Sequence, residues 1–166
     1  MTRKIGAGNF ELFFAPTGYA SNDQAPTATE LNDASVIELT DFLTDGGVAT
    51  PLDGSIVDSA DMGARFNKTA LGTFGGQPIV LQFYRDFPAA GDTAWTTLPR
   101  DTTGYYVLSR GGLATPGTFA ISDEIESWPM EVASRNPVDV ARNEMQQFTT
   151  ENAIPQVPLE DFVVAA

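Results

Sequence analysis

The sequence predicts a mainly β protein with little helix. Its 15 Gly and 11 Pro residues are spread along the chain as turn signals, a pattern typical of many short strands. Apolar residues make up 42% of the composition, enough for a globular core. A length of 166 residues corresponds to a single domain, which we assign to residues 1–166.

The first half of the chain predicts two strands and then a long inter-strand loop. Residues 10–14 are an aromatic and apolar run. Residues 36–43 mix β-branched and acidic side chains, a pattern that also permits a short helix. The segment from about residue 44 to 76 is rich in Gly, Asp, Ser and Thr. We expect it to be a loop that does not pack on its own, and loops of that length are usually functional or disordered.

The clearest predicted strand is residues 79–84, which is apolar on both faces. Its odd-numbered residues share one face, whereas Val80 and Tyr84 lie on the other. A strand of this kind needs a covering layer, which is a second sheet, a helix or a neighbouring subunit.

The second half predicts one short helix and several strands. Residues 92–98 favour the helix, with Asp92 as its N-cap. In the segment 128–134, Trp128 and its even-numbered neighbours point one way, whereas Glu131 and Arg135 point the other. A segment after Pro137, residues 138–147, permits either a second helix or a strand. The other predicted strands are residues 105–109, 119–125 and 146–154.

The C-terminal arm, from about residue 155 to 166, is expected to be extended because it contains two prolines. Its apolar side chains need burial, and the candidate contact residues are Leu159, Phe162 and Val163. The arm either docks on another subunit or covers the core of its own chain.

The charge and the missing residue types exclude many functions. The chain has 22 acidic and 9 basic residues, a net charge of −13, and no Cys or His. Relays of the Ser–His or Cys–His type and ordinary zinc sites are therefore absent, and we expect no enzyme, cofactor or metal. The acidic clusters at 58–61 and 123–126 lack calcium-loop spacing. Strong acidity also disfavours binding to nucleic acid or to anionic membranes, and no signal peptide or membrane span is predicted.

A series of motifs follows along most of the chain: residues 5–18, a Gly/Asp-rich segment after Asp41, and residues 81–85, 92–98, 103–111 and 128–132. In this order they resemble the major tail tube proteins of long-tailed bacteriophages, especially those of actinobacterial phages. The resemblance implies a β-sandwich or small barrel with one short flanking helix. It also implies that six subunits form a ring and that rings stack into a hollow tube through which genomic DNA passes. It places the protein in the virion tail, after assembly in the host bacterial cytoplasm.

The resemblance also implies partners and assembly residues. The partners are further copies of the chain and the tape measure, terminator and baseplate proteins, while viral DNA passes without specific binding. The long loop and the terminal arms would bridge stacked rings. The loop residues that we expect to contact a neighbouring ring are Asp53, Ile56, Arg65 and Phe66.

Acidic residues on the wall of such a tube would repel DNA and keep it centred. Our candidates for these lumen-lining residues are Glu124, Glu126 and Glu151, which lie on late predicted strands.

Two alternatives remain open from the sequence. One is another ring component of a phage tail, such as a terminator or distal tail protein. The other is a monomeric β-sandwich that binds carbohydrate through stacking aromatic residues, for which the candidates are Trp95, Tyr105, Tyr106 and Trp128.

Overall fold

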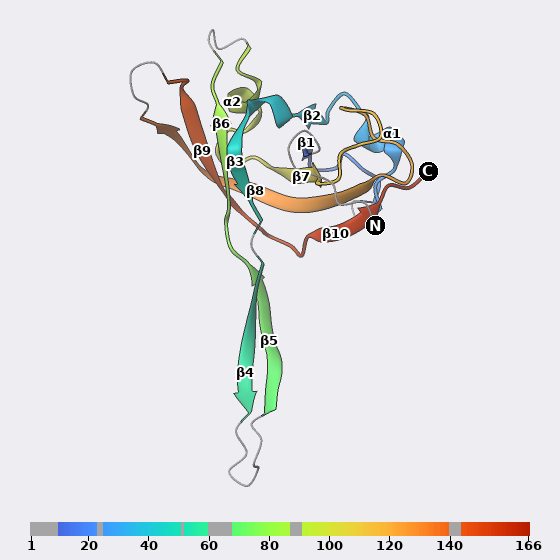
Figure 1. The fold of residues 1–166 in the computed structure, drawn as a ribbon, viewed down its shortest axis with the longest axis vertical. Helices are drawn as coiled ribbons and strands as arrows, with labels where there is room; N and C mark the ends of the chain where they lie inside the picture. Colours follow the sequence, from blue (N-terminus) through green and yellow to red (C-terminus); the bar gives the residue numbers. More distant parts are fainter. Residues whose placement is uncertain (1–9, 23–24, 51, 60–67, 87–90, 140–143) are drawn as a thin grey trace.

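The structure is a computed structural model that describes residues 10–22, 25–50, 52–59, 68–86, 91–139 and 144–166 (Figure 1). Strands dominate it, as the sequence predicts. The strands are β1 (Glu11–Pro16), β2 (Ile37–Glu38), β3 (Leu43–Ala49), β4 (Leu52–Ser59), β5 (Lys68–Gly76), β6 (Ile79–Tyr84), β7 (Thr103–Ser109), β8 (Glu124–Val138), β9 (Gln147–Ala153) and β10 (Leu159–Val163). The helices are α1 (Ala28–Leu31), a 3₁₀ turn η1 (Thr40–Phe42) and α2 (Thr93–Thr97).

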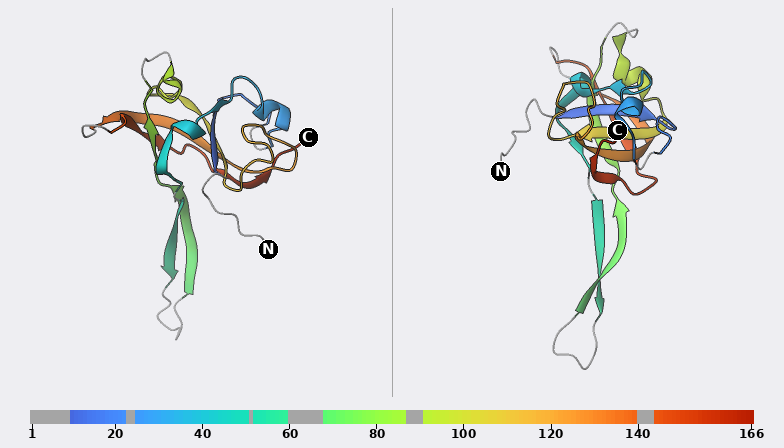
Figure 2. Two further views of the ribbon diagram at one scale, coloured as in Figure 1. Left: turned by 45° about the horizontal axis from the view of Figure 1, so that its top comes forward. Right: turned by 90° about the vertical axis from the view of Figure 1, so that its right-hand side faces the viewer.

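Most strands form one antiparallel sheet that curls into a half-barrel (Figure 2). In the described part of the chain its order is β2-β1-β7-β8-β9-β6-β3, and β10 pairs with β8. The sheet curls on itself and does not form two stacked layers. The remaining pair, β4 and β5, is a hairpin that projects from the body (Figure 1).

Strand β8 is long enough to have different partners along its length. Its first half pairs with β7 and β10, and its second half pairs with β9. Pairing with β9 shifts in register between Val132 and Ser134, which makes Ala133 an extra residue. A bulge of this kind reverses which side chains face the core beyond it.

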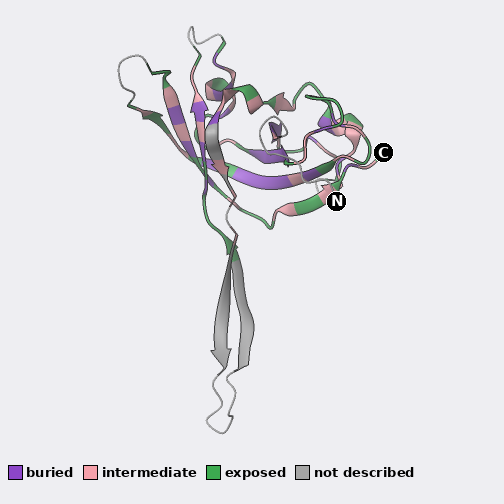
Figure 3. Ribbon diagram, viewed as in Figure 1, coloured by how far each residue is buried: buried purple, intermediate pink, exposed green. Residues whose placement is uncertain are grey.

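The main core lies inside the curl (Figure 3). Alternating side chains of β1, β6, β7, β8 and β9 point into it, and the segment of α2 covers it with Ala94 and Leu98. Trp128 and Phe83 are among its largest fully buried side chains. The predicted orientation of Trp128, Met130 and Val132 toward one face is confirmed.

A second, smaller core lies on the outer side of β1, β7 and the start of β8. Leu31 of α1, Phe119 and Val164 close it. Asn32 fixes the segment before β8, because its side chain both donates to the carbonyl of Phe119 and accepts from the amide of Phe119. The outer side of β6 and β9 has no such layer in the described chain, and Val80 is 45% exposed there.

The segment predicted as a long loop contains strand β3 and the β4–β5 hairpin. The hairpin register runs from Leu52 opposite Gly76 to Ser59 opposite Lys68, with one irregularity between Gly54 and Ile56. Gly- and Asp-rich composition predicts turns from local preference alone. Here a ladder of backbone hydrogen bonds to a partner strand holds the segment as a hairpin.

Other local predictions need correction. The predicted strand at 119–125 is mostly a turn, because Asp123 accepts hydrogen bonds from the amides of Ala114 and Ala120. The helix alternative for 138–147 is wrong at its start, since β8 continues through Pro137 and Val138. The predicted strand at 36–43 is divided between β2, η1 and the first residue of β3.

The predictions for the helices were partly correct. The helix predicted at 92–98 is confirmed as α2, but Asp92 makes no capping hydrogen bond. The sequence analysis missed α1, which begins with a capping box between Thr27 and Glu30. None of the helices in the described residues is long and apolar enough to span a membrane.

Candidate assembly surfaces

The β4–β5 hairpin extends well away from the half-barrel (Figure 1). Its two strands pair mainly with each other. Its base lies tightly against the end of β9, where a Cβ on Gly76 would come within 2.6 Å of Ile154 Cδ1. A two-stranded arm of this kind is marginal alone in water, which suits a segment that contacts another molecule.

The structure describes two of the four residues that we expect to contact a neighbouring ring. Asp53 lies opposite Gly75 near the base of the hairpin, and Ile56 lies opposite Leu71 further along it. Arg65 and Phe66 lie outside the described residues.

The outer face of β6, β9 and the middle of β8 is polar, and no described segment covers it. Glu151 is exposed on this face, and its Cα partners are Val80 on β6 and Ser134 on β8. Glu131 is exposed on the same face, opposite Ala153. The sequence analysis left Glu131 out of the candidates, although the alternation in residues 128–132 already placed it away from the core.

The other two predicted acids lie elsewhere. Glu126 lies on the same face of β8 as Trp128, where its carboxylate accepts hydrogen bonds from Trp128 Nε1 and from Arg110 Nε and Nη2. Its charge is therefore paired within the chain. Glu124 is exposed at the start of β8, opposite Val163. The structure does not bring Glu124, Glu126 and Glu151 together on one face.

The C-terminal arm covers its own chain, one of the two alternatives that the sequence left open. Leu159 and Phe162 are half-buried in or beside β10, which pairs with β8. Val164, just beyond β10, is buried in the second core. Val163 points outward with 51% exposure. A register shift and a left-handed Asp161, at φ 51°, let the apolar residues on both sides of the bulge reach the sheet.

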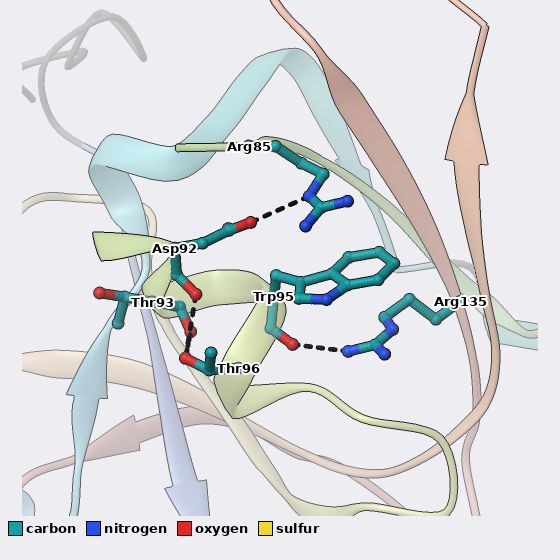
Figure 4. A network of polar contacts seen from close by, with 6 residues as sticks. All are labelled: Arg85, Asp92, Thr93, Trp95, Thr96 and Arg135. Carbon is teal, nitrogen blue, oxygen red and sulfur yellow. Dashed lines mark hydrogen bonds and ion pairs between the residues drawn. The ribbon is translucent and has the colours of Figure 1, made fainter. Parts of the chain in front are cut away.

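A stack of two arginines and one tryptophan lies beside α2 (Figure 4). The guanidinium carbons of Arg85 and Arg135 are 3.8 Å and 3.6 Å from the ring centre of Trp95. Arg85 Nε pairs with the buried carboxylate of Asp92 at 2.9 Å. Arg135 Nη1 donates to the carbonyl of Trp95 at 2.6 Å.

The sequence analysis placed Arg135 on the wrong face of its strand. Strict alternation from Trp128 sends Arg135 outward together with Glu131. The bulge at Ala133 instead pairs Arg135 with the buried Thr150, and so turns it toward the core side and Trp95. No local sequence signal marks this bulge.

The aromatic residues do not form an open platform for sugar stacking. Trp128 and Tyr106 are only 2% and 1% exposed, and Tyr105 is buried in the second core. The Trp95 ring has a guanidinium over it from Arg85 and another from Arg135. Among the described residues, no cluster of three or more acidic side chains is arranged to hold a metal ion.

These features define a mainly β protein with a curled half-barrel sheet and a projecting hairpin. The sequence profile of the phage tail tube protein family matches residues 1–166, and the chain therefore belongs to this family. It is a component of the virion tail. This membership also sets aside the carbohydrate-binding alternative.

Comparison with solved structures agrees at the level of the fold. A chain in the cryo-EM structure of the anti-feeding prophage (AFP) baseplate, 6-fold symmetrised, is similar with a TM-score of 0.61 and 11% sequence identity. The match covers 96% of this chain and 98% of that chain. No curated protein sequence matches the chain significantly.

Proposed function

We propose that this protein forms six-membered rings that stack into the hollow tube of a phage tail, and that phage DNA passes through the tube. Membership of the tail tube family supports the tube, and the similar baseplate chain comes from a structure with 6-fold symmetry. The partners in the tail are further copies of the chain and the proteins that end and fill the tube. The β4–β5 hairpin is long enough to reach beyond its own subunit, and we assign it to contacts between rings.

The observation that carries the proposal is the polar outer face of β6, β9 and β8. This face is left uncovered, carries Glu131 and Glu151 and exposes few apolar groups. A sheet face of this composition suits contact with water, and we assign it to the wall of the tube. Because β3 and β6 lie at one end of the sheet order, edge pairing with neighbouring copies would extend this face around a ring.

Charge supplies the mechanism of passage. Six copies at −13 each carry −78 formal charges per ring. DNA has about one negative charge per ~1.7 Å of its axis, and it binds proteins largely through Lys and Arg. Acids such as Glu131 and Glu151 on the wall would repel the phosphates and keep DNA hydrated and mobile.

Electron microscopy of the purified protein tests the assembly. Negatively stained samples are expected to contain rings and long tubes with a central hole, and end-on class averages are expected to have six-fold symmetry. Single rings that never stack would instead favour a terminator or distal tail protein. A monodisperse monomer at every protein and salt concentration would contradict the proposal.

Replacing both wall acids in the phage tests the mechanism. Glu131→Gln with Glu151→Gln is expected to leave tubes intact and to lower DNA delivery per assembled particle. The matched control is Glu124→Gln with Glu160→Gln, which removes the same charge from exposed positions at the start of β8 and on β10. Equal DNA delivery by the two double variants would contradict the proposal that the acids on this face aid the passage of DNA.

A further inference from the structure

Arg135 is held in a fixed position on the surface beside α2. The bulge at Ala133 turns it toward Trp95, the indole packs against its guanidinium, and the carbonyl of Trp95 accepts a hydrogen bond from Nη1. A stacked guanidinium keeps its N–H groups at the edge of the plane, where they are available to an acceptor. Among the described residues, the remaining N–H groups of Arg135 have no hydrogen-bond acceptor.

The charge of Arg135 has no partner of its own within the described chain. Asp92 pairs with Arg85 on the other side of the indole, and no carboxylate in the described residues lies within 4 Å of the Arg135 guanidinium. Partial burial, and then the nearby charge of Arg85, lower the pKa of Arg135. Arg135 therefore adds a cation with no carboxylate of its own among the described residues beside the Arg85–Asp92 pair, in a chain whose acids outnumber its bases by 22 to 9.

We propose that the Arg85–Trp95–Arg135 stack is a docking point for a carboxylate of a second copy of this chain. The proposal rests on the proposed function, because it requires that copies assemble. A carboxylate fits the edge of a guanidinium with two parallel hydrogen bonds. The stack orders the arginine before contact, which reduces the entropy lost on binding. A second copy at −13 supplies many exposed carboxylates, whereas the same net charge opposes approach of a nucleic acid phosphate.

Paired variants of the full chain test this inference. Arg135→Met removes the charge and keeps an apolar side chain beside Trp95. Arg100→Met removes the same charge at a position whose side chain is 76% exposed and has only a surface contact with Asp101. We expect the protein concentration for half-maximal tube assembly to rise at least ~10-fold for Arg135→Met, a change that corresponds to about 1.4 kcal/mol. Arg100→Met is expected to remain within about twofold of the wild type, since isolated surface charges contribute little.

Near-UV circular dichroism of the dissociated chains establishes that each variant is folded. If Arg135→Met does not fold, Arg135→Lys decides, because it keeps the cation and loses the planar pair of donors. Arg135→Lys is then expected to need at least ~3-fold more protein than the wild type. If the Arg135 variant that folds assembles at the same concentration as Arg100→Met, the docking point is overturned. Tubes formed by the wild type would still support the proposed function in that case.

A binding experiment with a short DNA duplex distinguishes a carboxylate of a second copy from a nucleic acid phosphate as the anion bound by Arg135. Binding of the duplex by the wild type that is lost in Arg135→Met, with unchanged assembly, would assign the site to phosphate and would overturn the proposal. Absence of duplex binding, together with the assembly defect, is the expected result.

Discussion

At the scale of single residues, Gly104 is required by the close approach of two strands. It lies on β7 opposite Pro16 of β1, where a Cβ would come within 2.5 Å of the carbonyl oxygen of Ala15 and 2.7 Å of the Phe14 ring. The backbone oxygen cannot move without disturbing the ladder between the two strands.

We therefore predict that Gly104→Ala lowers the free energy of unfolding by about 1–3 kcal/mol, the usual effect of overpacking. The control is Gly91→Ala, because nothing lies within 4 Å of a Cβ at Gly91. Urea denaturation of both variants measures the difference. Equal stability of the two would show that β1 and β7 move apart easily.

Glu30 makes the short helix α1 sensitive to acid. Its carboxylate accepts hydrogen bonds from the backbone amides of Ser21 and Thr27, and from both hydroxyls, and these bonds lower the pKa of Glu30 from 4.5 to about 2. A lowered pKa in the folded state means that this stabilisation is present above pH 4.5. It is lost as the pH falls from about 4.5 toward 2.

We predict that the urea midpoint of the wild type falls between pH 5 and pH 2.5, and that Glu30→Gln falls by less over the same range. The glutamine keeps an acceptor and has no proton to gain. Fluorescence of Trp95 and Trp128 reports the transition. Identical pH dependence in both proteins would mean that the hydrogen bonds of Glu30 do not persist in solution.

At the scale of elements, the β4–β5 hairpin is separable from the half-barrel. Strands β3 and β6, which it connects, are already antiparallel partners, with Ala49 opposite Val80. The two strands of the hairpin pair with each other along their length. The body therefore keeps its core without the hairpin beyond Leu52, the one described hairpin residue that packs against the main core.

We predict that replacing residues 53–75 with a short Gly-Ser turn, which keeps the basal pair of Leu52 and Gly76, changes the melting temperature by less than about 4 °C, which is about 1 kcal/mol for a domain of this size. The same change is expected to abolish stacking of rings. Calorimetry and negative-stain microscopy measure the two effects. Long tubes of the shortened chain would contradict our assignment of the hairpin to contacts between rings.

Local sequence preference predicted some elements well and others poorly. The strand at 79–84 was predictable because a short run of apolar and aromatic residues marks it. The position of α2 was also predicted correctly, although its expected cap, Asp92, makes no capping hydrogen bond. The hairpin was not, because Gly and Asp favour turns wherever no partner strand is considered. Arg135 was misplaced for a similar reason, since the bulge at Ala133 is a property of the β8–β9 pairing.

At the scale of the whole molecule, net charge opposes assembly. Every copy carries −13, so neighbouring copies repel each other unless salt screens them. The Debye length falls from about 30 Å at 0.01 M to about 8 Å at 0.15 M ionic strength.

We predict that tube assembly needs several-fold less protein at 0.15 M than at 0.01 M NaCl. Light scattering during a concentration series at each salt level measures this dependence. Stronger assembly at low salt would mean that ion pairs between copies outweigh the net repulsion.

The sequence alone determined the mainly β class of this protein, its net charge and which residues of several strands face the core. Composition and alternation are local properties and can be read without knowing which strands meet. The sequence also determined membership of the tail tube family, through motifs spread along the chain. Tertiary structure alone decided which acids share a surface: Glu151 and Glu131 lie on one outer face, whereas Glu126 is paired with Arg110. It also placed Arg135 against Trp95. Register and bulges decide such positions, and both depend on which strands meet across the sheet.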